Sequence, residues 1–105
     1  MPSLDGAPTG DYRTGMFVET ITADRDEWTS WSDSLRIATD PPASLVATIA
    51  WQNGDDTVTA VNVWESAEAV ADFFIERVQP TIATGGEPKS KPTRHGQPLV
   101  FYLRQ

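Results

Sequence analysis

The chain has 105 residues, which corresponds to one domain because a domain usually needs roughly 100 to 150 residues. Hydrophobic residues make up 39% and charged residues 22% of the chain, a composition typical of a folded globule rather than of a disordered or fibrous protein. Fifteen acidic against eight basic side chains give a net charge of −7, and such a surface repels phosphate backbones. We therefore expect no nucleic-acid partner.

Cysteine is absent and histidine occurs once, which excludes disulfides, a cysteine nucleophile and thiolate metal sites, and leaves too few ligands for a transition metal. No apolar run approaches the roughly 20 residues that cross a bilayer. Residues 1–15 also lack the basic and apolar regions of a signal peptide. We expect a soluble, cytoplasmic protein that binds neither a metal ion nor a membrane.

The first 15 residues are rich in glycine and proline and have little apolar periodicity, which predicts a flexible arm over residues 1–15 and a domain over residues 16–105. The segment 16–22, with the sequence MFVETIT, is short, β-branched and roughly alternating. This pattern predicts the first strand of the domain.

A helix is predicted to follow this strand. Asp24 and Glu27 have the spacing of a capping box, and the helix should end near Thr39 because Pro41 and Pro42 disfavour helical geometry before them. One face of the helix carries Trp28, Trp31 and Leu35.

Two β-prone runs, residues 44–52 and 57–64, are joined by residues 53–56 (NGDD), which tolerate the positive φ of a tight turn. This pattern predicts a β-hairpin. Alternation along the second run divides it into two faces, and neither face is cleanly polar, so both should be covered. One face carries Val58, Ala60, Asn62 and Trp64, and the other carries Thr57, Thr59, Val61 and Val63.

A second helix is predicted to begin after Ser66, which can cap it, and to end or kink at Pro80. At 100° per residue Phe73 falls off the predicted inward stripe, so its ring needs a covering partner or loop. The predicted inward stripe consists of Ala67, Ala71, Phe74, Ile75 and Val78.

A connector rich in glycine, proline and lysine is expected over residues 85–98, and LVFYL at residues 99–103 is expected to be the closing strand. The order β-α-β-β-α-β predicts an α+β, ferredoxin-like fold with an antiparallel sheet and both helices on one face. The bare sheet face would carry Val61 and Val63, which is too apolar for water. We therefore expect a homodimer in which two sheets pack together across a two-fold axis.

The junction between the hairpin and the second helix also has a recognisable motif. Trp64-Glu65-Ser66-Ala67-Glu68-Ala69 is followed by Phe73-Phe74, Glu76-Arg77-Val78 and Pro80. This stretch resembles the W-E-S-x-E-A…F…ER…P stretch of dimeric α/β-barrel proteins of the antibiotic-biosynthesis monooxygenase (ABM)-like superfamily, and the element order is similar from residue 16 to residue 103. The resemblance implies a ferredoxin-like dimeric α/β barrel. Members include cofactor-independent oxygenases acting on aromatic polyketides, heme-degrading enzymes, isomerases and many proteins without known activity, so the reaction is less defined than the fold.

Heme degradation in this superfamily uses an Asn on the first strand, the motif Trp and an iron-ligating His on the second helix. Trp64 matches the Trp, but residues 16–22 contain no Asn and residues 66–79 contain no His. Without an axial imidazole the main anchor for heme is missing. We therefore expect no heme and no other cofactor.

Oxygenation without a cofactor needs a dry pocket, a base and polar groups that hold an enolate. Glu19 lies in the middle of the first strand, where a buried carboxylate would be a candidate base; the alternative is a solvated or Arg-paired carboxylate at an edge. Asn62 shares a face with Trp64 and could bind a ligand carbonyl, or could be bonded to a neighbouring loop. Trp64 itself could be a packing residue, a ligand contact or both.

His95 lies in the basic stretch KSKPTRHG at residues 89–96. Such a stretch could form a lid that attracts an anionic substrate, with His95 as an alternative proton acceptor, or it could be a solvated loop.

Aromatic side chains are numerous for a small domain. Trp28, Trp31 and Phe74 could fill the core, or they could line a cleft between helices and sheet for a flat apolar ligand. Two functions follow. One is an ABM-like monooxygenase or binding protein for a hydrophobic, aromatic or polyketide-like molecule; the other is a non-catalytic dimer with an interaction or stress-related role, whose cleft its own tryptophans fill.

Overall fold

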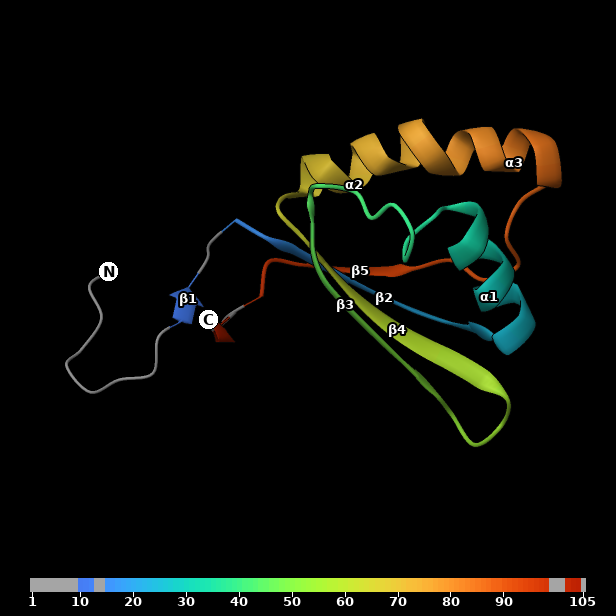
Figure 1. Ribbon diagram of the computed structural model, residues 1–105, viewed down its shortest axis with the longest axis horizontal. Helices are drawn as coiled ribbons and strands as arrows, with labels where there is room; N and C mark the ends of the chain where they lie inside the picture. The colour runs from blue at the N-terminus through green and yellow to red at the C-terminus, as the bar shows by residue number, and fades with distance from the viewer. Residues whose placement is uncertain (1–9, 13–14, 99–101, 105) are drawn as a thin grey trace.

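The computed structural model describes residues 10–12, 15–98 and 102–104. A four-stranded antiparallel sheet has the strand order β3-β4-β2-β5, and the helices cover one of its faces (Figure 1). The predicted ferredoxin-like fold is thus confirmed. The strands of this sheet are β2 (Phe17–Asp24), β3 (Leu45–Gln52), β4 (Thr57–Trp64) and β5 (Thr93–Gly96), and the helical segments are α1 (Arg25–Ser34), α2 (Ala67–Phe73), the π-helical turn η1 (Phe74–Val78) and α3 (Gln79–Gly85).

The start of α1 differs from the predicted capping box. Asp24 precedes the helix, but its side chain makes no capping hydrogen bond. The carboxylate of Glu27 instead accepts hydrogen bonds from the backbone N–H groups of Lys89 and Ser90, at 3.3 and 3.1 Å. The capping box is therefore wrong, because Glu27 is used to attach a distant loop to α1.

The predicted hairpin is confirmed, with β3 and β4 in antiparallel register around the turn. Asp56 has a φ of 67°, the left-handed conformation that Asp tolerates better than most residues. The Thr57 hydroxyl donates to Asp55 Oδ1 across 2.6 Å, and this bond, with a second from the Thr57 backbone N–H, lowers the pKa of the Asp55 carboxyl below its usual value. Side-chain hydrogen bonds thus support the turn.

The inward face of α2 is not the one predicted. Ser66 caps the helix as expected and accepts from the Ala69 N–H, but four residues of the predicted stripe are exposed: Ala67, Ala71, Phe74 and Ile75. Ala69 and Val70 are buried instead, and Phe73 packs on Trp64 with 4.8 Å between ring centroids. The helix phase is set by these contacts with Trp64, so Phe73 points inward and has the covering partner that the prediction lacked.

Pro80 neither ends the helix nor breaks the helical path. It is the second residue of α3, and the π-helical turn η1 lies directly before α3. Helical structure continues to Gly85, and Gly86, with a φ of 87°, follows it. With a ψ of 172° as well, Gly86 has a backbone conformation that glycine adopts far more readily than other residues.

The fourth strand of the sheet lies earlier than predicted. Thr93–Gly96, within the expected connector, forms β5 on β2. A short polar edge strand has no apolar alternation to reveal it, because it needs only backbone bonds with one neighbour. β6 (Tyr102–Arg104) pairs instead with β1 (Gly10–Tyr12). Residues 1–9 and 13–14 of the predicted arm and residues 99–101 of the predicted closing strand lie outside the described residues.

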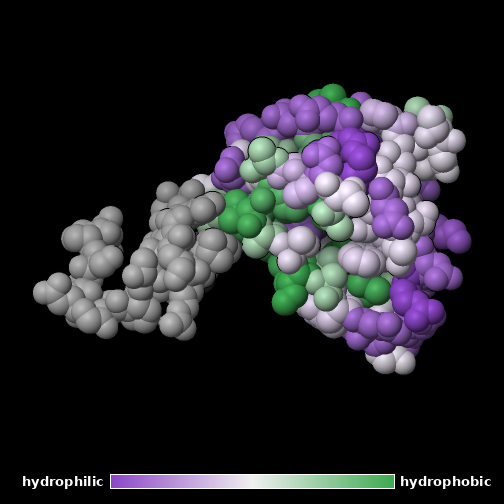
Figure 2. Space-filling model, in the orientation of Figure 1, coloured by the Kyte–Doolittle hydropathy of each residue, from purple (hydrophilic) through white to green (hydrophobic). Residues whose placement is uncertain are grey.

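The sheet face opposite the helices is apolar, as predicted. Strand register places Ile49 of β3 beside Val61 of β4, and Trp51 beside Thr59. Ile49 is 63% and Trp51 46% exposed. In the space-filling view the hairpin tip and the helices are mostly hydrophilic, while hydrophobic side chains gather over the strands (Figure 2).

The fully packed core is small and lies where β4 meets α2. Trp64 is only 1% exposed, and Ala69 and Val70 pack around it. By contrast, α1 contains no fully buried residue. In the part of the chain that the structure describes, no helix is long and apolar enough to span a bilayer.

Candidate functional site

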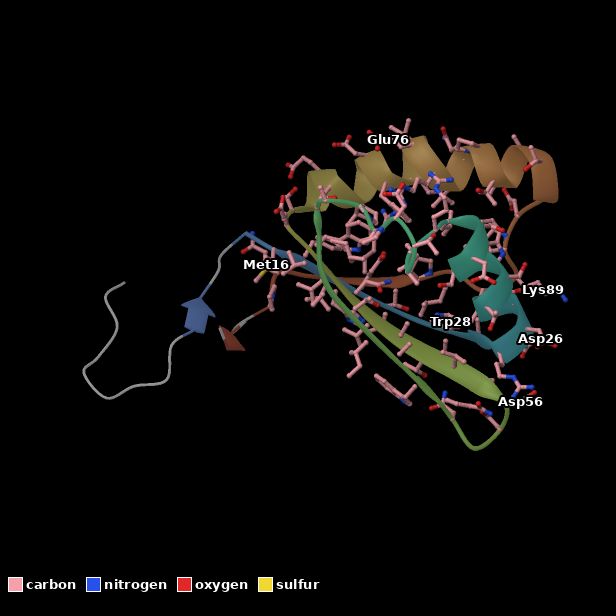
Figure 3. The ribbon with its side chains drawn as sticks, in the orientation of Figure 1. Met16, Asp26, Trp28, Asp56, Glu76 and Lys89 are labelled. Carbon is pink, nitrogen blue, oxygen red and sulfur yellow. The ribbon has the colours of Figure 1, made fainter. Side chains whose placement is uncertain are left out.

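A cavity of about 600 Å³ lies between the helices and the sheet, a volume in the usual range for small-molecule sites. The two tryptophans of α1, Trp28 and Trp31, form part of its wall. Figure 3 shows Trp28 on the side of α1 that faces the sheet. It shows Glu76 on the outer side of the helical segment that runs from α2 to α3, away from the sheet. The aromatic and aliphatic lining includes Ile21, Trp28, Trp31, Leu35, Ile37, Leu45, Trp64, Val70, Phe73, Phe74, Val78 and Ile82.

Glu19 is a buried carboxylate on the sheet wall of this cavity. Its side chain is 6% exposed, and it is the only buried charged residue in the described part of the chain. Glu19 Oε1 accepts a hydrogen bond from Trp64 Nε1 at 3.0 Å and one from Asn62 Nδ2 at 3.4 Å. Two donors on β4 therefore fix the orientation of a carboxylate on β2.

Asn62 is held in place by β3. The Thr48 hydroxyl donates to Asn62 Oδ1 across 2.7 Å, which leaves the amide nitrogen of Asn62 turned toward Glu19. Thr48, Asn62 and Glu19 are successive neighbours across β3, β4 and β2, so one row of the sheet forms a hydrogen-bonded chain along the cavity wall.

A loop covers one side of the cavity. Pro88, Ser90 and Lys91 line it, and the bonds from Lys89 and Ser90 to Glu27 attach this loop to α1. The loop then enters β5, where Arg94 is the register partner of Glu19 and also lines the cavity. The cavity lining thus combines apolar rings with two cationic side chains, of which Arg94 lies beside Glu19.

A second arginine positions the opposite wall. Arg77 of η1 donates to the backbone oxygens of Leu35 and Asp40, at 2.9 and 2.6 Å. These bonds join the segment after α1 to the second helical layer, and Leu35 and Ile37 of that segment line the cavity. The π-helical turn thereby directs Arg77 inward.

The structure brings together nearly all of the residues selected from the sequence. The residues of that set that line the cavity are Glu19, Trp28, Trp31, Asn62, Trp64 and Phe74. His95 is the exception. It lies at the irregularity in the β2–β5 register, and its Nε2 is 2.8 Å from Thr20 Oγ1. Thr20 pairs with Val61 on the apolar face, so His95 is on the side of the sheet away from the cavity.

Polar lining residues that were not selected from the sequence include Thr48, Lys91 and Arg94. Counting outward from the turn places Thr48 opposite Asn62, so the hairpin register would have revealed it. Arg94 and Lys91 were part of the recognised basic stretch, but nothing in its pattern indicated a strand beside Glu19.

The chemistry available here is proton transfer and binding of a flat apolar molecule. Glu19 can accept a proton in a largely apolar cavity, and Asn62 can hydrogen-bond a carbonyl or enolate oxygen. Within the described ranges, no three acidic or histidine side chains gather in a way that could hold a metal ion.

Comparison with known proteins supports the fold. No family model matches the chain, and no curated protein matches it in sequence. Among solved structures, protein SO0527 from Shewanella oneidensis superposes with a TM-score of 0.56 at 10% identity, covering 90% of this chain and 99% of that one. SnoaB, a cofactor-independent oxygenase from Streptomyces nogalater, superposes with a TM-score of 0.50 at 17% identity, covering 86% of this chain and 92% of that one. The chain therefore has the ferredoxin-like fold of these two proteins.

Proposed function

We propose that the cavity binds a hydrophobic, flat aromatic molecule and that Glu19 accepts a proton from an acidic C–H group of that ligand. The observation that carries this proposal is the buried Glu19 carboxylate, 6% exposed, oriented by Trp64 and Asn62 on the wall of a 600 Å³ cavity. A carboxylate in such a setting is a typical general base. The aromatic rings around it suit a planar polyketide-like ligand.

Cofactor-independent oxygenation is the reaction that we propose for this site. A ligand CH₂ group beside a carbonyl loses a proton to Glu19, and the carbanion is stabilised as an enolate. The carbanion then transfers electrons to dioxygen and forms a C–O bond as a peroxide. Protonation of the peroxide and loss of water leave a new C=O, so that CH₂ and O₂ become C=O and H₂O. The fold shared with SnoaB is an analogy in support.

The alternative function, a non-catalytic dimer with a cleft filled by its own tryptophans, is less well supported. Trp28 and Trp31 line the cavity wall and leave about 600 Å³ open. A self-filled cleft would instead bury the α1 tryptophans, whereas α1 contains no buried residue.

We also propose that two copies pair through the apolar sheet face. Ile49 and Trp51 are large and substantially exposed there, beside Val61 and Val63 of the next strand. A second copy would remove this surface from water. Sedimentation should show twice the 11.5 kDa chain mass, and Ile49→Lys should shift the protein toward monomer. A wild-type protein that sediments as a stable monomer would refute the pairing.

Tryptophan fluorescence provides a direct binding test. Trp51 lies on the opposite sheet face, while the other three tryptophans line the cavity, so Trp51→Phe leaves only cavity reporters. Titration of this variant with anthrone-like and quinone-like compounds should give saturable quenching. Absence of saturable quenching with every compound would contradict the proposed binding function.

The base is tested with a matched pair of substitutions. Glu19→Gln should lower the rate of oxygen consumption by roughly 10²- to 10⁴-fold with any compound that the wild-type protein oxidises. Glu76→Gln, on the outward side of the helical layer (Figure 3), should leave the rate unchanged. An equal rate in Glu19→Gln and wild type would exclude Glu19 as the base.

A further inference from the structure

Two cationic side chains line the cavity of a strongly acidic protein. Lys91 is in the loop before β5 and Arg94 is on β5, whereas the chain as a whole has a net charge of −7. Both side chains are exposed to solvent where they border the cavity. The chain has only eight basic residues, so two of them beside one apolar wall need a specific explanation.

Neighbouring carboxylates do not account for these cations. Glu19 Oε1 accepts from Trp64 and Asn62, and both oxygens of Glu27 accept backbone N–H groups of the loop. Glu87, the third carboxylate on the lining, is exposed to solvent. The ion pairs formed among the described residues involve Arg25, Arg36 and Arg77, and neither Lys91 nor Arg94 takes part in them.

We infer that the ligand carries a carboxylate and that Arg94, assisted by Lys91, binds it. This inference rests on the proposed binding function and adds the charge of the ligand to it. A planar guanidinium can bind a carboxylate with two parallel hydrogen bonds, and an ammonium group adds a second positive charge. The ligand is thus an aromatic acid rather than a neutral aromatic molecule.

The sheet register also gives the ligand an orientation. Arg94 and Glu19 are Cα partners on β5 and β2, and partners in an antiparallel pair project side by side from the same face. The carboxylate therefore binds at the β5 edge of the cavity. The aromatic part extends from there along the apolar wall formed by Trp28, Trp31 and Phe74.

The test compares two ligands of nearly the same shape, anthracene-9-carboxylate and its methyl ester, by fluorescence titration of the Trp51→Phe variant at pH 7. The carboxylate should bind about tenfold more tightly, the usual effect of a hydrogen bond to a charged group. This preference should decrease as sodium chloride is added, because salt screens exposed charges, while the affinity of the ester should change little.

Variants locate the source of the preference. In the Trp51→Phe background, Arg94→Met should abolish most of the preference for the carboxylate and Lys91→Met should reduce it, with the ester affinity nearly unchanged. Lys89→Met is the matched control. Lys89 is in the same loop and is exposed at the outer edge beside α1 (Figure 3), and its bond to Glu27 uses only the backbone N–H, so its loss should leave the preference intact.

The outcomes distinguish the inferred carboxylate recognition from the proposed binding of aromatic ligands in the cavity. Equal affinity for the two ligands, or an unchanged preference in Arg94→Met, would overturn the inference while the cavity function stands. An equal loss of preference in Lys89→Met would also overturn it, because the effect would then come from the net charge of the loop. If neither ligand quenches saturably, both the proposed function and the inference are wrong.

Discussion

Trp64 donates its indole N–H to the carboxylate of Glu19 across 3.0 Å, although the two residues are not direct partners in the sheet. Glu19 pairs with Asn62, and Trp64 lies two residues further along β4 on the same face. One residue thus packs against Phe73 of α2 and orients a carboxylate on β2. Trp64 belongs to both the packed core and the cavity wall. Substitutions in the core should therefore alter the cavity wall as well.

Trp64→Phe keeps an aromatic ring against Phe73 but removes the indole donor. We expect the free energy of unfolding to fall by about 2–4 kcal/mol, from the smaller ring and the loss of a donor to a buried carboxylate. Urea denaturation measures this change. Trp28→Phe, on α1, where no residue is fully buried, should lower the free energy of unfolding by less than about 1 kcal/mol. Similar losses in both variants would show that the bond between Trp64 and Glu19 does not contribute to stability.

Thr48→Val keeps the shape of the side chain and removes the hydroxyl that orients Asn62. Stability should fall by only about 0.5–1 kcal/mol, because Thr48 is exposed. The free energy of ligand binding, measured in the fluorescence titration, should weaken by more than this loss in the free energy of unfolding. Thr22→Val, which removes the hydroxyl bonded to Thr59, is the control, and an affinity as low as that of Thr48→Val would argue against a role for Asn62.

Glu27→Ala should release the loop that covers the cavity. The amides of Lys89 and Ser90 lose their acceptor, so their hydrogen exchange should accelerate by about tenfold. NMR exchange rates of these two amides measure the effect. In Glu87→Ala, a change in the same loop, the two rates should remain as in wild type; if Glu27→Ala also leaves them unchanged, the attachment to α1 does not hold the loop.

Arg77→Met removes the side chain that joins the segment after α1 to η1. Two backbone oxygens lose a charged donor whose side chain is only 14% exposed, so the free energy of unfolding should decrease by about 2–3 kcal/mol in urea denaturation. Arg36→Met also breaks an ion pair with Asp40, but both partners are exposed, and its effect should be near zero. The same small effect in both variants would contradict the positioning role of Arg77.

The sequence predicted the fold because two signals agreed. The strand of residues 57–64 has an apolar face with Val58, Ala60 and Trp64, all buried in the structure, and the turn chemistry of residues 53–56 joined it to its partner. Strand parity also placed Asn62 and Trp64 on the cavity side. These features are local, so sequence alone determines them.

Other features depended on contacts between distant segments. The packing of Phe73 on Trp64 determines which face of α2 points inward. The helical periodicity of apolar residues alone predicted an inward face with Ala67 and Ile75 instead. Glu27 looked like a capping residue because its spacing from Asp24 fits, yet its partners lie more than 60 residues away. The polar strand β5 has no pattern of its own, which concealed both the position of Arg94 beside Glu19 and that of His95 on the opposite face.

Indole N–H signals in a ¹H–¹⁵N NMR spectrum of the wild-type protein test the central claim most directly, since the chain has four tryptophans. When anthrone is added, the signals of Trp28, Trp31 and Trp64 should shift together and saturate, with that of Trp64 reporting on its bond to Glu19. The Trp51 signal should stay in place. A shift confined to Trp51, or no shift at the solubility limit of the ligand, would contradict binding in the cavity beside Glu19.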